Sequence, residues 1–427
     1  VNVHVFKAGE FKGIAEPFLR NGMSDGSREI SRRWLEGAWR HYTTRVEARR
    51  ELAEGTIDAF VDGFPQAVAA HGGDLAQTAL ANSLVDKIML RTEASDYIAG
   101  VVGASDEDGA YEAVDFERYL TQRRPGIEST LGKRQVAVIP ARGNIRGGEQ
   151  PAGTIGSGTL GPLIRDAAED PEVAAIVLRV DTGGGSTFAS ELIRQQILEA
   201  REIGKPVVVS MGSVAASGGY WIAAAADQVW ATPTTVTGSI GVFLALPTVE
   251  ELLERGGIST DGVGTTRFAG SYRPDRALQP EVSAVYQAGV NHFHELFIQI
   301  ISEGRDLDRE VVRPLANGGA ILGDAAHELG LVDEIGGRRE AIAAAAALAG
   351  LDEGEYVPVV FEQQPGPREM FLRGLAGDAQ TLLGGLEPSW QATLRSWSAP
   401  LRAGLSVLEN LDDPRNIYAH CLVCLAP

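Results

Sequence analysis

Alternation of strands and helices between residues 133 and 360 constrains the fold of this chain more than any other feature. Short apolar runs of strand length are separated there by helical stretches such as SELIRQQILEAREIG, and the runs read QVAVIPARG, AAIVLRVDT, KPVVVSMG and DQVWATPTT. Such alternation predicts an α/β fold with a parallel sheet covered by helices. Apolar residues at steps of three and four then predict a long amphipathic helix, through Tyr286, Val290, Phe293, Phe297 and Ile300.

A weak internal repeat predicts two tandem related domains. The segment TALANSLVDKI at 78–88 parallels AAHELGLVDEI at 325–335. Upstream of each, FKAGEFKG at 6–13 parallels RFAGSYRP at 267–274. Self-similarity of this kind indicates a duplicated unit. Lys12 in the first copy then corresponds to Arg273 in the second, which is too basic to serve as a neutral base.

The turn-rich break RRPGIESTLG sets the expected domain boundaries. Residues 1–120 are predicted to be the back half of an incomplete first domain, and residues 121–132 a linker. Residues 133–360 are predicted to form a complete second domain, with 361–427 as a peripheral tail. Because the chain begins with VNVHVF and has no leader, we expect a fragment or processed form whose N-terminal part is missing.

Composition argues against several classes of function. The chain has 57 acidic and 38 basic residues, a formal charge of −19, which disfavours general binding of nucleic acid. No apolar run approaches the ~20 residues of a membrane-spanning helix, so the chain as given is expected to be soluble. Cys421 and Cys424 form one C-x-x-C without a second ligand pair or a βαβ context, which favours a local disulfide or two idle thiols. We expect no cofactor and no metal.

Ser217 lies where a strand pattern changes to a helix pattern, in the run VVVSMGSVAASGGYWIAAAADQVW. Serine is a favoured helix N-cap, so one interpretation is a cap. A strand-to-helix turn also exposes its side chain at the sheet edge, where the helix N-terminus favours developing negative charge. Gly218 and Gly219 allow a substrate backbone to approach. Ser217 is therefore a candidate nucleophile as well as a cap.

A serine nucleophile needs a base. No histidine lies between Ser217 and His292, which disfavours a Ser-His-Asp arrangement, and His292 and His294 lack the spacing of a zinc site. Lysine is rare in the chain, and Lys12 stands in a segment with few charges, where burial favours the neutral amine. A surface Lys12 paired with Glu16 is the alternative.

Two glycine-containing turns complete the candidate site. The loop RVDTGGGSTFASE lacks the lysine of a P-loop and the order of a dinucleotide site. It is therefore a plain turn or an oxyanion hole made of backbone N–H groups. In TVTGSIGVF, Ser239 either orients a base or is only a turn residue.

Together these motifs resemble the signal peptide peptidase A (protease IV) family, bacterial Ser/Lys peptidases with a Clp-protease or crotonase type of fold. The resemblance is to the long, two-domain form, and it runs in family order through GEFKGIAEPF, RVDTGGGS, MGSVAASGGYW, TGSIGVF and DDPRNIYAHCLVC. It implies that Ser217 is the nucleophile, Lys12 the general base and Ser239 the hydroxyl that orients the lysine. Gly185 and Gly218 would supply the oxyanion N–H groups.

One departure from the family pattern affects the glycine turn. The family loop usually reads S-P-G-G-S, and here Thr182 and Gly183 replace the Ser-Pro pair. Loss of the fixed φ of proline is expected to loosen this turn. Gly184 and Gly185 are retained, so the oxyanion hole itself is still expected.

The resemblance implies a serine endopeptidase with a Ser/Lys dyad between two domains. Its implied substrates are remnant signal peptides and other small membrane-associated peptides. It further implies a homotetramer, an upstream membrane anchor, and a place at the bacterial inner membrane with the catalytic region facing the periplasm, where Cys421 and Cys424 can oxidise. The alternatives are a crotonase-type acyl-CoA enzyme and a catalytically silent scaffold of the same fold.

Overall fold

The computed structural model describes residues 2–13, 16–105, 111–123, 132–271, 273–362 and 413–421. It divides the chain into two compact units. The larger unit contains residues 1–35 and 133–427, and the smaller unit contains residues 36–132. Lys12 and Ser217 therefore lie in the same unit. The domain boundaries expected from the repeat and the linker stay predictions.

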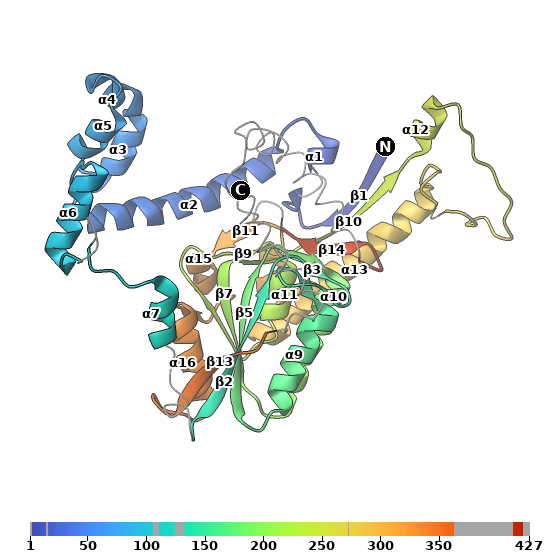
Figure 1. Ribbon diagram of the computed structural model, residues 1–427. Helices are drawn as coiled ribbons and strands as arrows, with labels where there is room; N and C mark the ends of the chain where they lie inside the picture. The colour runs from blue at the N-terminus through green and yellow to red at the C-terminus, as the bar shows by residue number, and fades with distance from the viewer. Residues whose placement is uncertain are drawn as a thin grey trace, which may run out of the picture. The chain divides into compact units, whose positions relative to one another are not determined.

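The larger unit is built around an eight-stranded sheet (Figure 1). Its main path runs β11-β9-β7-β5-β2-β13, and β8 pairs with both β7 and β12. All pairs are parallel except β9 with β11. The strands are β2 (Arg134–Arg142), β5 (Val173–Thr182), β7 (Val207–Ala216), β8 (Gln228–Ala231), β9 (Val236–Gly238), β11 (Ala320–Leu322), β12 (Glu334–Ile335) and β13 (Tyr356–Val360). The expectation of an α/β fold with a parallel sheet is confirmed.

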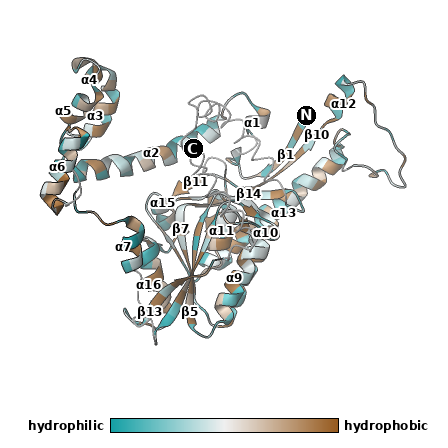
Figure 2. Cartoon of the chain, in the orientation of Figure 1, coloured by the Kyte–Doolittle hydropathy of each residue, from teal (hydrophilic) through white to brown (hydrophobic). Residues whose placement is uncertain are grey.

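Both faces of the central strands are buried, which explains their continuous apolar runs. Val207 and Val209 of β7 join the main core cluster, whereas Val208 between them packs with the cluster that contains Ala341 and Ala345 of α16 (Arg338–Leu348). Successive side chains of a strand point to opposite faces, so the valines of this run alternate between the two sides of the sheet. Figure 2 shows the apolar residues of these strands and the mixed surface of the surrounding helices.

The helices of the larger unit include the predicted amphipathic one, which is confirmed as α13 (Pro280–Arg305) and buries Val290, Phe297 and Ile300. The others are α1 (Glu16–Leu19), α9 (Ser157–Glu169), α10 (Thr187–Glu202), α11 (Gly218–Ala223), α12 (Glu250–Arg255), α14 (Arg309–Leu315), α15 (Gly323–Glu328) and α16. Helix α2 (Asp25–Arg49) starts in the larger unit and continues into the smaller one.

A second, six-stranded sheet has the order β1-β10-β14-β6-β3-β4. Its strands are β1 (Asn2–Ala8), β3 (Ile145–Arg146), β4 (Ile155–Gly156), β6 (Gly184–Ser186), β10 (Val242–Thr248) and β14 (Ile417–His420). The pairs β1/β10, β10/β14 and β14/β6 are antiparallel, which the strand–helix alternation did not predict. Strand β14 belongs to the segment expected to be a peripheral tail, yet Ile417, Tyr418 and Ala419 are buried in it.

The smaller unit consists of short helices. These are α3 (Thr56–Asp62), α4 (Phe64–Ala70), α5 (Leu75–Ala81), α6 (Arg91–Val102) and α7 (Phe116–Arg123). Asp74 is the N-cap of α5, and its carboxylate accepts hydrogen bonds from the N–H groups of Ala76 and Gln77. Inside this unit the Glu47 carboxylate accepts the Ile57 N–H at 2.9 Å. Within the described part of the chain, no helix has the length and apolar character to cross a membrane.

Candidate active site

Ser217 sits in the turn between the end of β7 and the start of α11, as the sequence predicted. The prediction that its hydroxyl caps the helix is wrong, because the side chain makes no capping bond. An N-cap residue has extended backbone angles, whereas Ser217 has φ 56° and ψ −111°. Positive φ is costly for a non-glycine residue and is found at functional turns such as the nucleophile elbow. The Ser217 N–H donates to Gly238 O at 2.8 Å.

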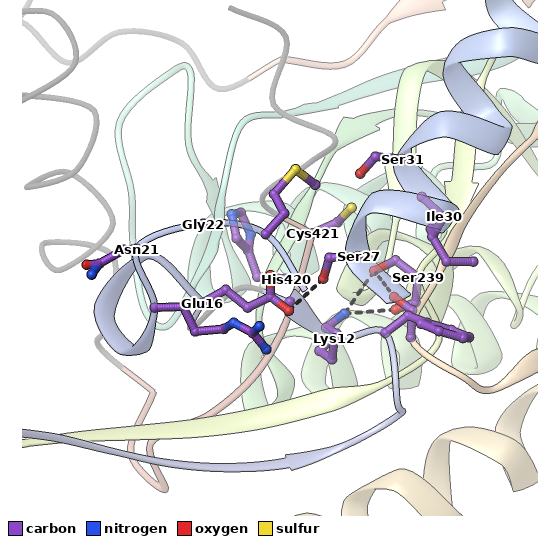
Figure 3. Close-up of a pocket in the computed structure, with 16 residues that line it drawn as sticks. Lys12, Glu16, Asn21, Gly22, Ser27, Ile30, Ser31, Ser239, His420 and Cys421 are labelled. Atoms are coloured by element: carbon purple, nitrogen blue, oxygen red, sulfur yellow. Dashed lines mark hydrogen bonds between the residues drawn. The ribbon is translucent and has the colours of Figure 1, made fainter. Parts of the chain in front are cut away.

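Lys12 contacts Ser217 directly. Its Nζ lies 2.6 Å from Ser217 Oγ, 2.8 Å from Ser239 O and 3.0 Å from Ser239 Oγ. Figure 3 shows the lysine reaching Ser239 from the pocket side. Lys12 is only 3% exposed, and this burial lowers the pKa of its amine well below the ordinary lysine value.

The three contacts match the bonding capacity of an uncharged amine. A neutral lysine has two N–H donors and one lone pair. The Ser239 hydroxyl donates to Gly318 O at 3.3 Å, so its oxygen is left to accept from Lys12. Ser239 O accepts the second N–H of Lys12, and the lone pair then faces the Ser217 hydroxyl. Burial favours the uncharged amine, in which the lone pair can accept from the Ser217 hydroxyl.

The alternative of a surface Lys12 paired with Glu16 is wrong. The Glu16 carboxylate instead accepts from the Ser24 N–H at 3.0 Å and from the hydroxyls of Ser24 and Ser27 at 2.5 and 2.7 Å. Burial raises the pKa of Glu16, but the bonds from Ser24 and Ser27 outweigh burial and leave this pKa lowered. Arg273, the repeat partner of Lys12, pairs on the surface with Asp275.

Two segments bring Lys12 to Ser217. Strand β1 pairs with β10, and its last residue, Ala8, lies opposite Val242. The turn that follows β1 and contains Lys12 therefore lies near the start of β10. There the Phe11 N–H donates to Asn317 O at 2.7 Å. Gly318 has φ +84°, and a Cβ on it would lie 2.8 Å from Lys12 N. This N-G-G turn was not predicted from the sequence, although its two glycines were the available signal.

The two glycines predicted for the oxyanion hole lie close together. Gly185 is in β6 and Gly218 is the first residue of α11, and a Cβ on Gly218 would come within 3.2 Å of Gly185 N. The Thr182 hydroxyl accepts the Gly184 N–H at 3.0 Å. This hydrogen bond to the Thr182 side chain stabilises the turn at the place where the family pattern has Ser-Pro.

A pocket of about 470 Å³ opens beside Lys12 and Ser239 (Figure 3). Apolar side chains from several segments line it, together with Glu16, Ser27 and His420; among them are Phe11, Met23, Ile30 and Ala320. Burial lowers the pKa of His420 to about 4, so the imidazole is neutral at ordinary pH. The sequence analysis gave His420 no role.

Cys421 also lines this pocket and is disulfide-bonded. Cys424 lies outside the residues that the structure describes. Over the described ranges, no group of three or more His, Cys, Asp or Glu side chains is arranged to hold a metal ion.

A serine hydroxyl against a buried lysine amine, beside two closely spaced glycines on an α/β scaffold, is the arrangement of a serine hydrolase site. A model of peptidase family S49 matches residues 1–103 and 199–352, a range that includes Lys12, Ser217 and Ser239. The chain therefore belongs to peptidase family S49. It is a serine endopeptidase, which confirms the expectation from the resemblance and leaves the acyl-CoA enzyme and silent-scaffold alternatives without support.

Individual relatives agree with this assignment. The chain is 35% identical to Protease 4 of Salmonella typhi and to Protease 4 of Haemophilus influenzae, with 99% of this chain covered in each case. It spans 68% and 69% of their respective lengths. A solved membrane-bound stomatin-specific protease covers 55% of this chain and is wholly covered itself, at 17% identity and a TM-score of 0.35. That structural likeness is too low to add to the assignment.

Proposed function

We propose that this chain hydrolyses peptide bonds through a Ser217/Lys12 dyad. The observation that carries the proposal is the 2.6 Å contact between Lys12 Nζ and Ser217 Oγ, with the lysine buried. An unperturbed lysine has a pKa of about 10.4 and cannot accept a proton at neutral pH. Burial lowers the pKa of Lys12 well below its ordinary value, which favours the neutral amine that a general base requires.

The proposed reaction begins when Ser217 Oγ attacks the substrate carbonyl carbon and its proton passes to the lone pair of Lys12. The carbonyl electrons move to oxygen, and the N–H groups of Gly185 and Gly218 stabilise that oxyanion. Collapse breaks the C–N bond, and the Lys12 ammonium returns the proton to the leaving amine. Water then attacks the Ser217 ester and gives its proton to Lys12. The bond between the acyl carbon and Ser217 Oγ breaks, the Lys12 ammonium returns the proton to Oγ, and the acid product leaves.

Ser239 acts in this proposal as a positioning residue. Its carbonyl and hydroxyl oxygens accept both N–H groups of the neutral amine, which leaves the lone pair directed at Ser217. Neither acceptor carries a full negative charge, so neither raises the pKa of Lys12 as a carboxylate would.

The proposed substrates are remnant signal peptides and other small membrane-associated peptides with a small or apolar residue before the cut. The apolar lining of the pocket beside Lys12 supports this preference. We further propose a homotetramer held at the bacterial inner membrane by an upstream anchor, with the catalytic region facing the periplasm. These parts rest on the resemblance to the long, two-domain family form, and light scattering and cell fractionation of the native protein test them.

The decisive experiment for the dyad is mass spectrometry of the intact protein after treatment with a fluorophosphonate. We expect one adduct on Ser217 in the wild-type chain and none in Ser217→Ala. Lys12→Ala should slow the labelling strongly, because the hydroxyl then lacks its base. Labelling of the wild-type chain at a different serine, or unchanged labelling in Lys12→Ala, would refute the dyad.

A further inference from the structure

Strand β14 lies between the two strands that flank the candidate site. On one edge it pairs antiparallel with β6, matching Tyr418 with Ser186 and Ala419 with Gly185. On its other edge it pairs antiparallel with β10, which follows Ser239 in the chain. The chain's own C-terminal segment therefore fills a slot one strand wide next to the proposed oxyanion glycines.

The Ala419 carbonyl occupies the place where an oxyanion would form. The Cys421 N–H donates to Gly183 O at 2.7 Å, and hydrogen-bonded pairs alternate along an antiparallel ladder. The next such pair is Ala419 with Gly185, so the Gly185 N–H points to the Ala419 carbonyl. The same oxygen would lie 2.9 Å from a Cβ on Gly218.

The proposed nucleophile is also inaccessible in this conformation. Ser217 is 0% exposed, although its hydroxyl contacts the base and it stands at a strand-to-helix turn. A substrate carbonyl cannot enter the oxyanion hole while the Ala419 carbonyl is there. The conformation described is therefore closed to substrate.

We propose that residues 417–420, Ile-Tyr-Ala-His, are a built-in pseudosubstrate that occupies the main-chain binding site for extended peptides and must leave before a peptide is cleaved. This inference rests on the proposed function of Ser217 and Lys12. Ala419 takes the place of the residue before the scissile bond, and His420 takes the place of the residue after it. The small side chain of Ala419 agrees with the proposed preference for small residues there.

Specific bonds hold the segment in this register. The buried Asp413 carboxylate accepts the Phe188 N–H at 3.1 Å and the Ile417 N–H at 3.2 Å, and it also accepts the Ser186 hydroxyl. The Thr187 hydroxyl donates to Ile417 O at 2.8 Å. These contacts are made by residues that precede Ala419. They attach the segment to Ser186, Thr187 and Phe188, which follow the glycine turn. Main-chain pairing of this kind is how extended peptides bind to a sheet edge.

The test uses Ala419→Pro in the full chain. Proline has no N–H and cannot donate to Gly185 O, so it weakens the pairing of β14 without changing a proposed catalytic group. If about nine in ten molecules are closed, release of the segment raises the apparent kcat/KM on a fluorogenic peptide by about tenfold. The fluorophosphonate labelling rate of Ser217 should rise by a similar factor. Pro414→Ala, an exposed position in the same segment, is the matched control and should change neither rate.

Two further measurements keep the inference falsifiable if Ala419→Pro folds poorly. A synthetic peptide of residues 413–420, DPRNIYAH, should inhibit the wild-type enzyme competitively, and a scrambled peptide should not. In wild-type protein, hydrogen exchange at Ile417–Cys421 should increase once Ser217 carries the label. Exchange in β14 that stays as slow as in β5 after labelling, or lack of inhibition by the peptide, would show a permanent structural strand and overturn the inference.

The outcomes separate this inference from the proposed function. Failure of Ser217 to react in every variant refutes the dyad itself. Normal reaction of Ser217 at equal rates in the wild-type chain and a folded Ala419→Pro variant refutes only the pseudosubstrate.

Discussion

Lys12 Nζ lies 2.6 Å from Ser217 Oγ although 205 positions separate the two residues in the chain. The contact depends on the pairing of β1 with β10, which brings the Lys12 turn next to Ser239. In the proposed dyad, the base and the nucleophile meet only through tertiary structure and act as one unit. Loss of either partner should therefore have nearly the same effect.

Lys12→Ala should reduce peptidase turnover about as far as Ser217→Ala, and the double variant should be little worse than either. Residues that act as a unit in a serine hydrolase are strongly non-additive. Lys12→Arg should also fail, because a guanidinium stays charged and cannot accept the serine proton. Steady-state rates on one peptide measure all four variants. Lys205→Ala, outside the site, is the control, and near-normal turnover of Lys12→Arg would contradict the dyad.

Peptidase activity should rise with pH as Lys12 loses its proton. Burial lowers the pKa of Lys12 well below its ordinary value, so the neutral amine becomes populated at a lower pH than that of a free lysine. Below the lowered pKa the amine is protonated and inactive, and above it the rate should level off. A profile of kcat/KM against pH measures this rise, and its midpoint reports the pKa of the base in the free enzyme. Activity that falls over the same range would exclude Lys12 as the base.

Local patterns were sufficient to predict the larger sheet and the long helix. The buried valines of β7 form a continuous apolar run because both faces of the sheet are covered, and α13 has a regular apolar stripe. Local patterns also indicated Lys12, Ser217 and Ser239 as candidates, the resemblance supplied their roles, and the structure brings these three side chains together. Their catalytic roles stay predictions.

The second sheet and the covering of Ser217 could not be predicted in this way. The run Ile417–His420 is too short to indicate which strands it joins, since its partners in β6 and β10 are more than 170 positions away. The burial of Asp413 follows from backbone N–H groups that meet only in the folded chain. The cap predicted for Ser217 failed because the turn adopts positive φ, which no residue type at that position signalled.

Gly318→Ala should impair catalysis more than stability. A Cβ at this position would lie 2.8 Å from Lys12 N and 3.1 Å from Lys12 Cβ, so Lys12 must shift and its contact with Ser217 is disturbed. The positive φ adds a cost of about 1 kcal/mol to folding. The matched control is Gly350→Ala, since Gly350 has φ +74° and nothing within 4 Å of the added carbon. Both variants should unfold at lower urea concentration, Gly318→Ala more so because of its contact with the Lys12 backbone, and only Gly318→Ala should lose peptidase activity.

Replacement of Lys12 by methionine should change how stability depends on pH. The folded chain holds Lys12 with a lowered pKa, while the unfolded chain has a lysine near its ordinary value of about 10.4. Between those two pKa values the unfolded state binds one proton more than the folded state, so the free energy of unfolding rises with pH there, by up to about 1.4 kcal/mol per pH unit. Below the lowered pKa both states are protonated and this contribution is flat.

Lys12→Met has no titrating amine at this position, so its free energy of unfolding should lack the part of the pH dependence that Lys12 contributes. The substitution also leaves Ser239 O without its donor. Its stability relative to the wild-type chain should therefore decline steadily as pH rises through the window. Urea denaturation of both proteins over a pH series measures the difference, and the other titrating groups cancel because both chains contain them. Lys133→Met serves as the control for removing a lysine elsewhere. Parallel stability curves for Lys12→Met and the wild-type chain would mean that Lys12 titrates normally and is not the stored base.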